Sequence, residues 1–258
     1  MKRMHVIALF AAGLLLASPL FALDGRTVMQ MASDTKAPEY THTLVTMDLI
    51  EKDGSSQSRV MEEWGRDKDG ETSAVIVFRS PASVKNTRFL QVVHEGGGSD
   101  KWIYLPSLKS TRRIASSEGS KSFMGSDATY DDMSDRDVDD DTHELLSESD
   151  GKNGYTCYQV KSTPKDAGSS QYLYRISWVD HETNLPVYVE MYDKKGELLK
   201  VLSVDEIKDV EGYHTPMVDS LKNVQTGHST KITITNIEVD KPVPSKVFTQ
   251  NFLSTGKV

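Results

Sequence analysis

From Glu39 onward, hydrophobic and polar residues alternate along most of the chain. Val45, Met47 and Leu49, for example, are separated by polar residues and fall on one face of an extended segment. A period of two is typical of strands that bury one face, because successive side chains point to opposite sides. Residues 74–78 (AVIVF) are hydrophobic throughout, which indicates a strand covered on both faces.

This alternation predicts about eleven strands between residues 43 and 239. Many of them are separated by short turns, such as Asp53-Gly54 and Asp69-Gly70. Consecutive strands joined by tight turns pair as hairpins, which produces an antiparallel sheet. A sheet with this many strands curls or closes on itself. The sequence therefore predicts a mostly β protein with a single curved antiparallel sheet or barrel, in one domain.

Helices are expected to be few and short. Asp24 can cap a helix that runs past Val28, and residues 80–85 begin with Ser-Pro, which is typical of a helix start. Residues 123–133 contain Thr-Tyr-Asp-Asp, close to a capping box, and predict another short helix. Residues 244–253 are expected to form a short helix or a loop.

Residues 96–149 interrupt the strand pattern. They open with three glycines, carry a basic cluster of Lys109, Arg112 and Arg113, and end in an acidic stretch. A long insertion with weak periodicity inside a compact domain is usually a functional loop or lid. We therefore expect this lid-like insertion to be the part of the protein that moves.

The N-terminus has the features of a secretory signal peptide. Lys2 and Arg3 precede a hydrophobic run over residues 6–16, and Ala22 ends a plausible cleavage site. The run is too short to span a bilayer, which needs about 20 hydrophobic residues. We expect residues 1–22 to be removed and 23–258 to form the exported protein. Because no cysteine lies near the cleavage site, no lipid anchor is expected.

The formal net charge of −8 argues against nucleic-acid binding, since such binding depends on neutralising phosphates with Lys and Arg. The lone cysteine, Cys157, has no local cationic cluster that could lower its pKa. A small buried core residue is therefore favoured over a reactive thiol. Without a disulfide, the fold must depend on its hydrophobic core.

The sequence offers little for catalysis or metal binding. The most acidic stretch could bind a divalent cation weakly, but a solvated acidic loop is favoured. It contains Asp131, Asp132, Asp135, Asp137, Asp139, Asp140 and Asp141, followed by His143 and Glu144. The histidines share no zinc-ligand spacing, and no Gly-x-Ser-x-Gly motif is present. We expect no catalytic residue, metal or cofactor, and no enzyme activity.

Large hydrophobic and aromatic side chains on the predicted strands are the remaining candidates. They would line an apolar cavity or simply fill an ordinary core. The set is Trp64, Phe78, Phe89, Trp102, Tyr104, Tyr172, Tyr174, Trp178, Tyr188 and Met191. A barrel of about eleven strands is wide enough to need a plug or a ligand.

Several motifs resemble one bacterial family. They are 102–106 (WIYLP), 112–114 (RRI), 122–127 (SFMGSD) and 129–132 (TYDD). These stretches resemble the outer-membrane lipoprotein-sorting proteins, which are similar in fold to the periplasmic carriers LolA and LolB. The resemblance implies an unclosed β-barrel of about eleven antiparallel strands, with short helices as a lid or plug, in the periplasm. It also implies an apolar cavity for lipid or lipoprotein acyl chains, and an inner-membrane exporter of the resistance-nodulation-division type as partner.

Carriage of an acyl chain by a monomer is thus the leading interpretation. Phe123, Met124 and Tyr130 are expected to act as hydrophobic plugs in the lid, while Arg112 and Arg113 contact lipid head groups or the acidic loop. A protein-binding sensor or exporter-accessory module is the alternative in another class, with Trp102 and Tyr104 as its surface patch. A metal-assisted hydrolase that uses the acidic run is a third.

Overall fold

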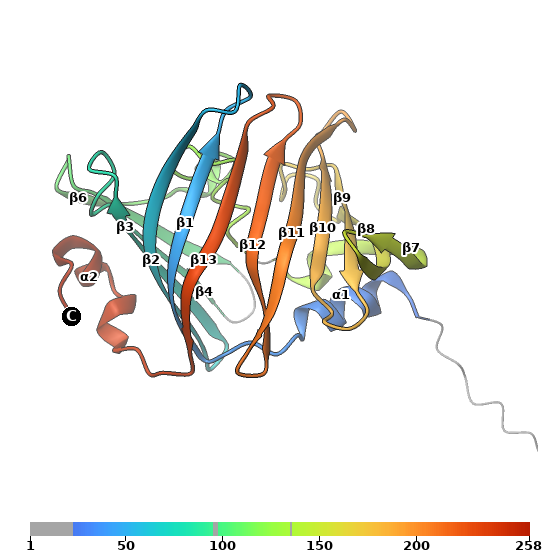
Figure 1. The fold of residues 1–258 in the computed structure, drawn as a ribbon, viewed down its shortest axis with the longest axis horizontal. Coiled ribbons are helices and arrows are strands. Elements are labelled where there is room, and N and C mark those ends of the chain that lie inside the picture. The colour runs from blue at the N-terminus through green and yellow to red at the C-terminus, as the bar shows by residue number, and fades with distance from the viewer. Residues whose placement is uncertain (1–22, 95–97, 135) are drawn as a thin grey trace, which may run out of the picture.

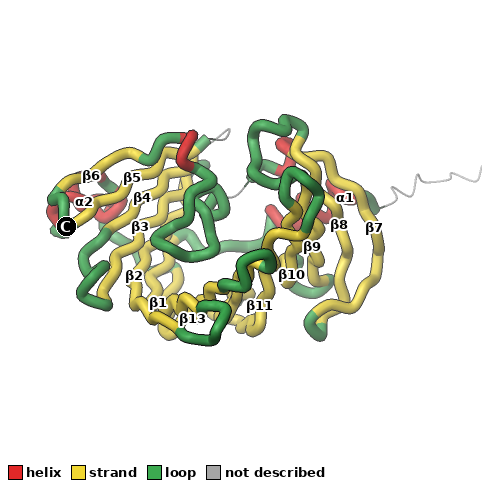
Figure 2. The backbone as a smooth tube through the Cα atoms, turned by 90° about the horizontal axis from the view of Figure 1, so that it is seen from above, coloured by secondary structure: helices red, strands yellow, loops and turns green. Residues whose placement is uncertain are grey.

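The computed structural model describes residues 23–94, 98–134 and 136–258. The predicted signal peptide, residues 1–22, and two of the three glycines of 96–98 lie outside these ranges. The described chain folds around one antiparallel sheet of thirteen strands, which curls into a half-barrel with two separate edges (Figures 1 and 2). The strands are β1 (Tyr40–Ile50), β2 (Ser56–Lys68), β3 (Glu71–Ser80), β4 (Arg88–Val93), β5 (Ser99–Leu105), β6 (Ser110–Arg113), β7 (Asp141–Lys152), β8 (Tyr155–Pro164), β9 (Tyr174–Asp180), β10 (Pro186–Tyr192), β11 (Leu198–Val210), β12 (Tyr213–Asn223) and β13 (Ser229–Val239).

The strand order is β6-β5-β4-β3-β2-β1-β13-β12-β11-β10-β9-β8-β7. All but one of the pairs join strands that are neighbours in sequence; the exception is β1 with β13, where Met47 lies opposite Ile232. The strands β6 and β7 follow each other in the chain but form opposite edges of the sheet. The segment between them must therefore cross the open side of the half-barrel.

The predicted fold class is confirmed, with thirteen strands where about eleven were expected. Less of the expected insertion, residues 96–149, is irregular than predicted, because β5, β6 and β7 occupy much of it. The strand β7 escaped recognition because its sequence is mostly polar and acidic, so the hydrophobic half of its alternation is weak.

The described part of the chain has two α-helices, both in segments where the sequence allowed a short helix. The helix α1 (Gly25–Ser33) is capped by Asp24, whose carboxylate accepts a hydrogen bond from the Thr27 amide at 2.7 Å. Near the C-terminus, the 3-10 helix η3 (Ser245–Phe248) leads into α2 (Gln250–Thr255). Two further 3-10 turns, η1 (Ser116–Glu118) and η2 (Val138–Asp140), lie near the two ends of the segment that crosses from β6 to β7.

Two predicted helices were wrong. Residues 80–85 form a single turn, since Val84 and Lys85 both donate to the Pro81 carbonyl and β4 starts at Arg88. Residues 123–133 form irregular turns, in which Met124 and Gly125 take positive φ values of 52° and 81°. Two consecutive residues in the left-handed region cannot continue a right-handed helix.

The C-terminal segment covers the convex face of the sheet near β3 and β4. Val75, Val77 and Leu90 pack against Phe252 and Leu253. The alternate residues of β3, Ile76 and Phe78, belong to the cluster on the concave face. Both faces of β3 are thus buried, as the uninterrupted hydrophobic run predicted.

The concave face of β1 to β6 is filled by the crossing chain. Residues 114–134, which we call the plug segment, lie inside the half-barrel (Figure 2). Phe123 and Tyr130 of this segment are 1% and 6% exposed and pack with Phe78, Phe89 and Met61. The plug segment therefore supplies the core of one half of the molecule.

Candidate functional site

Polar contacts fix the plug segment to both halves of the sheet. Asp132 forms an ion pair with Lys200 of β11 at 2.9 Å, and both side chains are almost fully buried. The hydroxyl of Tyr172 donates to the same carboxylate at 2.9 Å. Burial alone would raise the pKa of Asp132, but the charge of Lys200 and the hydrogen bonds from Lys200 and Thr129 lower it. Asp132 is therefore held as a carboxylate.

Asp127 ties the other end of the plug segment to β13. Its carboxylate accepts from the Thr230 hydroxyl at 2.8 Å and contacts the His228 ring nitrogen at 2.7 Å, while its amide donates to Thr230 at 2.9 Å. Arg59 of β2 also donates to the Met124 carbonyl. The aspartates of the GSD and TYDD motifs thus latch the plug, which gives these motifs a physical role.

The other half of the concave face contains a cavity of about 420 Å³. It lies between α1, residues 131–134 and 136–141, and the strands β9 and β10. Met29 and Ala32 of α1 and Val189 and Met191 of β10 form much of its hydrophobic wall. A volume of this size falls in the range of ordinary small-molecule pockets, about 300–1,000 Å³.

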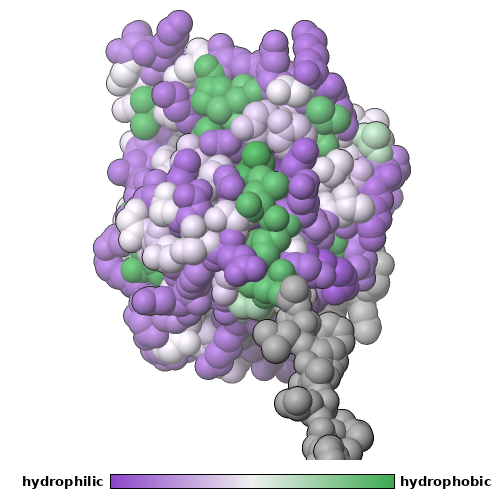
Figure 3. Space-filling model, turned by 90° about the vertical axis from the view of Figure 1, so that its right-hand side faces the viewer, coloured by the Kyte–Doolittle hydropathy of each residue, from purple (hydrophilic) through white to green (hydrophobic). Residues whose placement is uncertain are grey.

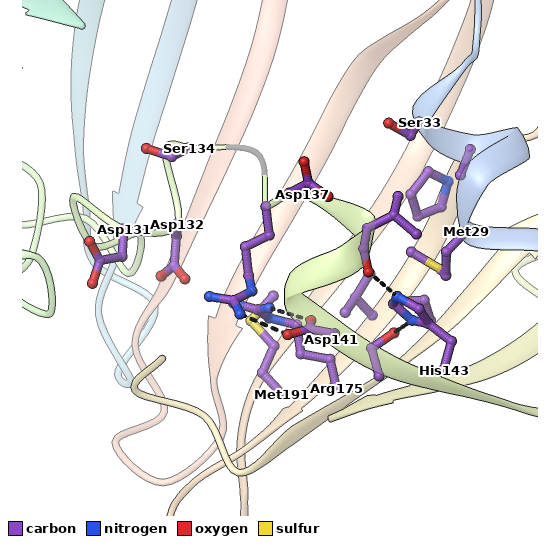
Figure 4. A pocket seen from close by; sticks show the side chains of 17 residues that line it. Met29, Ser33, Asp131, Asp132, Ser134, Asp137, Asp141, His143, Arg175 and Met191 are labelled. Atoms are coloured by element: carbon purple, nitrogen blue, oxygen red, sulfur yellow. Dashed lines mark hydrogen bonds and ion pairs between the residues drawn. The ribbon is translucent and has the colours of Figure 1, made fainter. Parts of the chain in front are cut away.

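Charged side chains lie beside this hydrophobic wall (Figure 4). Arg136 pairs with the buried Asp141 at 2.7 Å, and Arg175 lies 4.0 Å from the same carboxylate. Met191 lies next to Arg175 and Asp141, whereas Met29 and His143 lie on the α1 side (Figure 4). The cavity therefore has one hydrophobic wall and one wall with two guanidinium groups.

A second, more polar cavity of about 870 Å³ adjoins the first. The two cavities are adjacent, since their linings have six residues in common: Ser33, Asp131, Ser134, Arg136, Asp137 and Arg175. The end of the molecule that carries α1 and β7 has a mostly polar surface crossed by a narrow hydrophobic strip (Figure 3). The hydrophobic part of the cavity is thus reached through polar surroundings.

The ten residues predicted to line an apolar cavity do not lie together. Met191 lines the cavity, and Tyr172 lies beside it under Arg175, with 4.8 Å between guanidinium carbon and ring centre. Phe78 and Phe89 are buried against the plug segment. These four lie on the concave side of the sheet, whereas the remaining six face its other side.

Those six aromatic residues occupy two places on the convex face. Trp64, Trp102 and Tyr104 pack with the C-terminal segment. Tyr174 and Trp178 alternate along β9 with Arg175 and Ser177, which line the cavity, so they point away from it. Tyr188 lies opposite Trp178 on β10 and packs on it edge to face.

The predicted lid residues are found in and beside the plug segment. Phe123, Met124 and Tyr130 belong to its hydrophobic packing. Arg112 instead pairs with Glu118 at 2.8 Å, and Arg113 pairs with Asp100. Both arginines thus pair with carboxylates outside the acidic run, and their contact with lipid head groups stays a prediction.

The partners of the acidic run come from distant elements. Asp131 lies 3.9 Å from Lys101, and Asp139 lies 2.9 Å from Arg26 of α1. Among the residues that the structure describes, no group of three or more metal-ligating side chains is placed to hold a metal ion. Cys157 is fully buried, and burial raises the pKa of its thiol to about 11. None of the helices in the described ranges is long and hydrophobic enough to cross a membrane.

Sequence reasoning named Met191 and the aspartates of the acidic run but missed other residues that shape the cavity. Met29, Arg136 and Arg175 come from a helix, a loop and a strand, far apart in the chain. The only local signal was the strand alternation that places Arg175 on the inner face of β9, where a hydrophobic residue would be expected.

Solved structures share this architecture. A domain from Vibrio parahaemolyticus that is described as an outer membrane lipoprotein-sorting protein is 28% identical over 89% of this chain and 98% of its own, with a TM-score of 0.83. A DUF1329 family protein from Desulfovibrio piger is 26% identical over 89% of this chain and 97% of its own, also with a TM-score of 0.83. A LolA superfamily protein from Nitrosomonas europaea is 17% identical over 90% of this chain and 100% of its own, with a TM-score of 0.68. At this level of identity the likeness concerns the fold alone.

A search among curated proteins found no match. The model of a protein family described as "Uncharacterized protein" matches residues 70–255. The match covers most of the sheet together with the plug segment and the C-terminal helix. The chain therefore belongs to this family, and it shares its fold with outer-membrane lipoprotein-sorting and LolA superfamily structures.

Proposed function

We propose that this protein is a periplasmic carrier that holds an acyl chain of a lipid or lipoprotein in the cavity beneath α1. The observation that carries the proposal is this cavity, which has a hydrophobic wall of Met29, Ala32, Val189 and Met191. Each buried CH₂ group contributes about 0.8 kcal/mol, so one long chain gives reversible binding of useful affinity. The likeness to a domain named for lipoprotein sorting supports the same role.

The carrier acts without catalysis in this proposal. It is exported after removal of residues 1–22, works as a monomer and hands its cargo to or from an inner-membrane exporter of the resistance-nodulation-division type. Release needs a state that the partner binds better than the loaded state. Residues 136–140, which lead into β7 beside the cavity, are the part that we expect to move.

Uptake of a labelled fatty acid or lipopeptide by the delipidated, folded protein tests this function. The Ala32→Trp variant should abolish uptake because the indole fills the cavity. The matched control is Ala82→Trp, at an exposed position in the turn between β3 and β4, which should bind like the wild type. Absence of uptake by the folded wild type would contradict carriage and favour a module that binds a protein partner.

A further inference from the structure

Arg175 projects from β9 into the space between the two sheet edges. It lines both adjoining cavities, and its side chain is 22% exposed. Its guanidinium carbon lies 4.8 Å from the centre of the Tyr172 ring, which supports it from one side. Although burial lowers the pKa of Arg175, an arginine in a protein keeps its charge. A cation is therefore held in place at the junction of the cavities.

This guanidinium has no close anionic partner among the described residues. Asp141 is the one carboxylate within 4.0 Å of Arg175, and it is already bound by Arg136 at 2.7 Å. Within the described ranges, no hydrogen bond joins the Arg175 guanidinium to the protein. A planar fork of N–H donors thus faces the cavity without a short contact.

The other carboxylates around the cavity already have their own partners. Asp132 is bound by Lys200 and Tyr172. Asp137 accepts the amide of Asp139 at 2.7 Å, and Asp131 lies 3.9 Å from Lys101. Among the described residues, none of these carboxylates accepts a hydrogen bond from Arg175, so its N–H donors are available to one more anion.

We propose that Arg175 forms a head-group subsite that selects single-chain amphiphiles with a carboxylate or phosphate head. This inference rests on the proposed carrier function and specifies its ligand class. An anionic head receives paired hydrogen bonds from the Arg175 fork, a geometry that suits carboxylate and phosphate oxygens. The chain then extends along the adjacent Val189 and Met191 toward Met29 of α1. A cavity of about 420 Å³ suits one chain better than the several chains of a large lipid.

Binding of three ligands with the same alkyl chain tests the subsite: dodecanoate, dodecyl phosphate and dodecanol. The wild type should bind at least one of the anions about tenfold more tightly than dodecanol, since a charge-assisted hydrogen bond is worth roughly that factor. Arg175→Gln should weaken anion binding about tenfold more than dodecanol binding and so remove this preference. Asp141 retains Arg136 in this variant, so the fold should persist.

Two further variants separate a subsite from a general effect of charge. Arg26→Gln removes an exposed cation beside the cavity that pairs with Asp139, and it should keep the preference for the anion. Arg175→Lys retains the charge without the fork and should keep only part of the preference, which provides a second readout if Arg175→Gln folds poorly.

Each outcome decides the inference. Equal binding of anions and dodecanol by the wild type, an unchanged preference in Arg175→Gln, or an equal loss in Arg26→Gln would overturn the subsite while leaving carriage intact. Failure of the folded wild type to bind any of the three ligands would overturn both proposals.

Discussion

The two halves of the same concave face have opposite interiors. On β1 to β5 most of the inward residues are hydrophobic, among them Met47, Met61 and Phe89, and the plug segment packs on them. On β8 and β9 the inward residues include Ser162, Arg175 and Ser177, and a cavity remains. A hydrophobic plug over these polar groups would leave them without hydrogen bonds, which is unfavourable. The inward side chains of the strands thus determine which half is solid and which is open.

The largest expected effect concerns the filled half. Phe123→Ala removes a side chain that is 1% exposed and packs on Phe78, Phe89 and Tyr130. We expect the free energy of unfolding to fall by about 3–5 kcal/mol, as for other large-to-small changes in a core. Urea denaturation measures the loss. Leu108→Ala, at a side chain that is 66% exposed, is the control and should change stability by less than about 0.5 kcal/mol. A similar small change in both variants would contradict a filled interior.

The ion pair between Asp132 of the plug segment and Lys200 of β11, which we call the latch, should give the next largest loss of stability. Lys200→Met leaves the buried Asp132 without its cation, and we expect a loss of about 3 kcal/mol in the free energy of unfolding. Adding Asp132→Asn should recover part of this loss, because no buried charge then remains unpaired. Denaturation of the two single variants and the double variant gives the coupling energy. Strictly additive losses would show that the pair does not act as a latch.

A smaller change in the free energy of unfolding depends on pH and comes from two carboxyl groups, one on β2 and one on β12. Glu63 of β2 follows the inward Met61 by two residues, and Asp219 of β12 lies opposite Ile232, which packs against the same core. Burial, followed by the charge of Asp219, raises the pKa of Glu63 to about 7. Burial, followed by the charge of Asp205, raises that of Asp219 to about 6. The folded protein thus binds these protons more tightly than the unfolded chain does.

Stability should therefore fall as the pH rises from about 4.5 to 7, over which the unfolded chain has released the Glu63 proton and the folded protein has not. Glu63→Gln should be more stable than the wild type by about 1–3 kcal/mol at pH 8 and equal to it at pH 4. Thermal unfolding at the two pH values checks this. The neighbouring Glu62 pairs with Arg79 at 2.5 Å, so Glu62→Gln should instead lose stability at pH 8. Equal stabilisation by Glu63→Gln at both pH values would contradict the assignment.

The sequence predicted the filled half far better than the open half. The alternation at Val45, Met47 and Leu49 and the hydrophobic run of β3 were enough to predict the curved sheet and its doubly covered strand. The Asp24 cap predicted α1. Local patterns of this kind depend on neighbouring residues, which a sequence displays directly.

The open half depends on contacts between distant residues. The Arg136–Asp141–Arg175 group joins a loop to β7 and β9, and no periodicity connects these positions. The capping-box pattern at residues 129–132 was misleading for a related reason. Thr129 and Asp132 do exchange the expected hydrogen bonds, but Asp132 also binds Lys200, so the pattern stabilises a latched turn in place of a helix.

Methyl NMR of methionines during a titration with dodecanoate compares the two halves directly. Met29 and Met191 line the cavity, whereas Met47 and Met61 lie in the filled half. If the open half receives the acyl chain, the signals of Met29 and Met191 shift with saturation while those of Met47 and Met61 stay in place. Shifts confined to Met47 and Met61, or no shift in any of the four, would contradict ligand binding beneath α1.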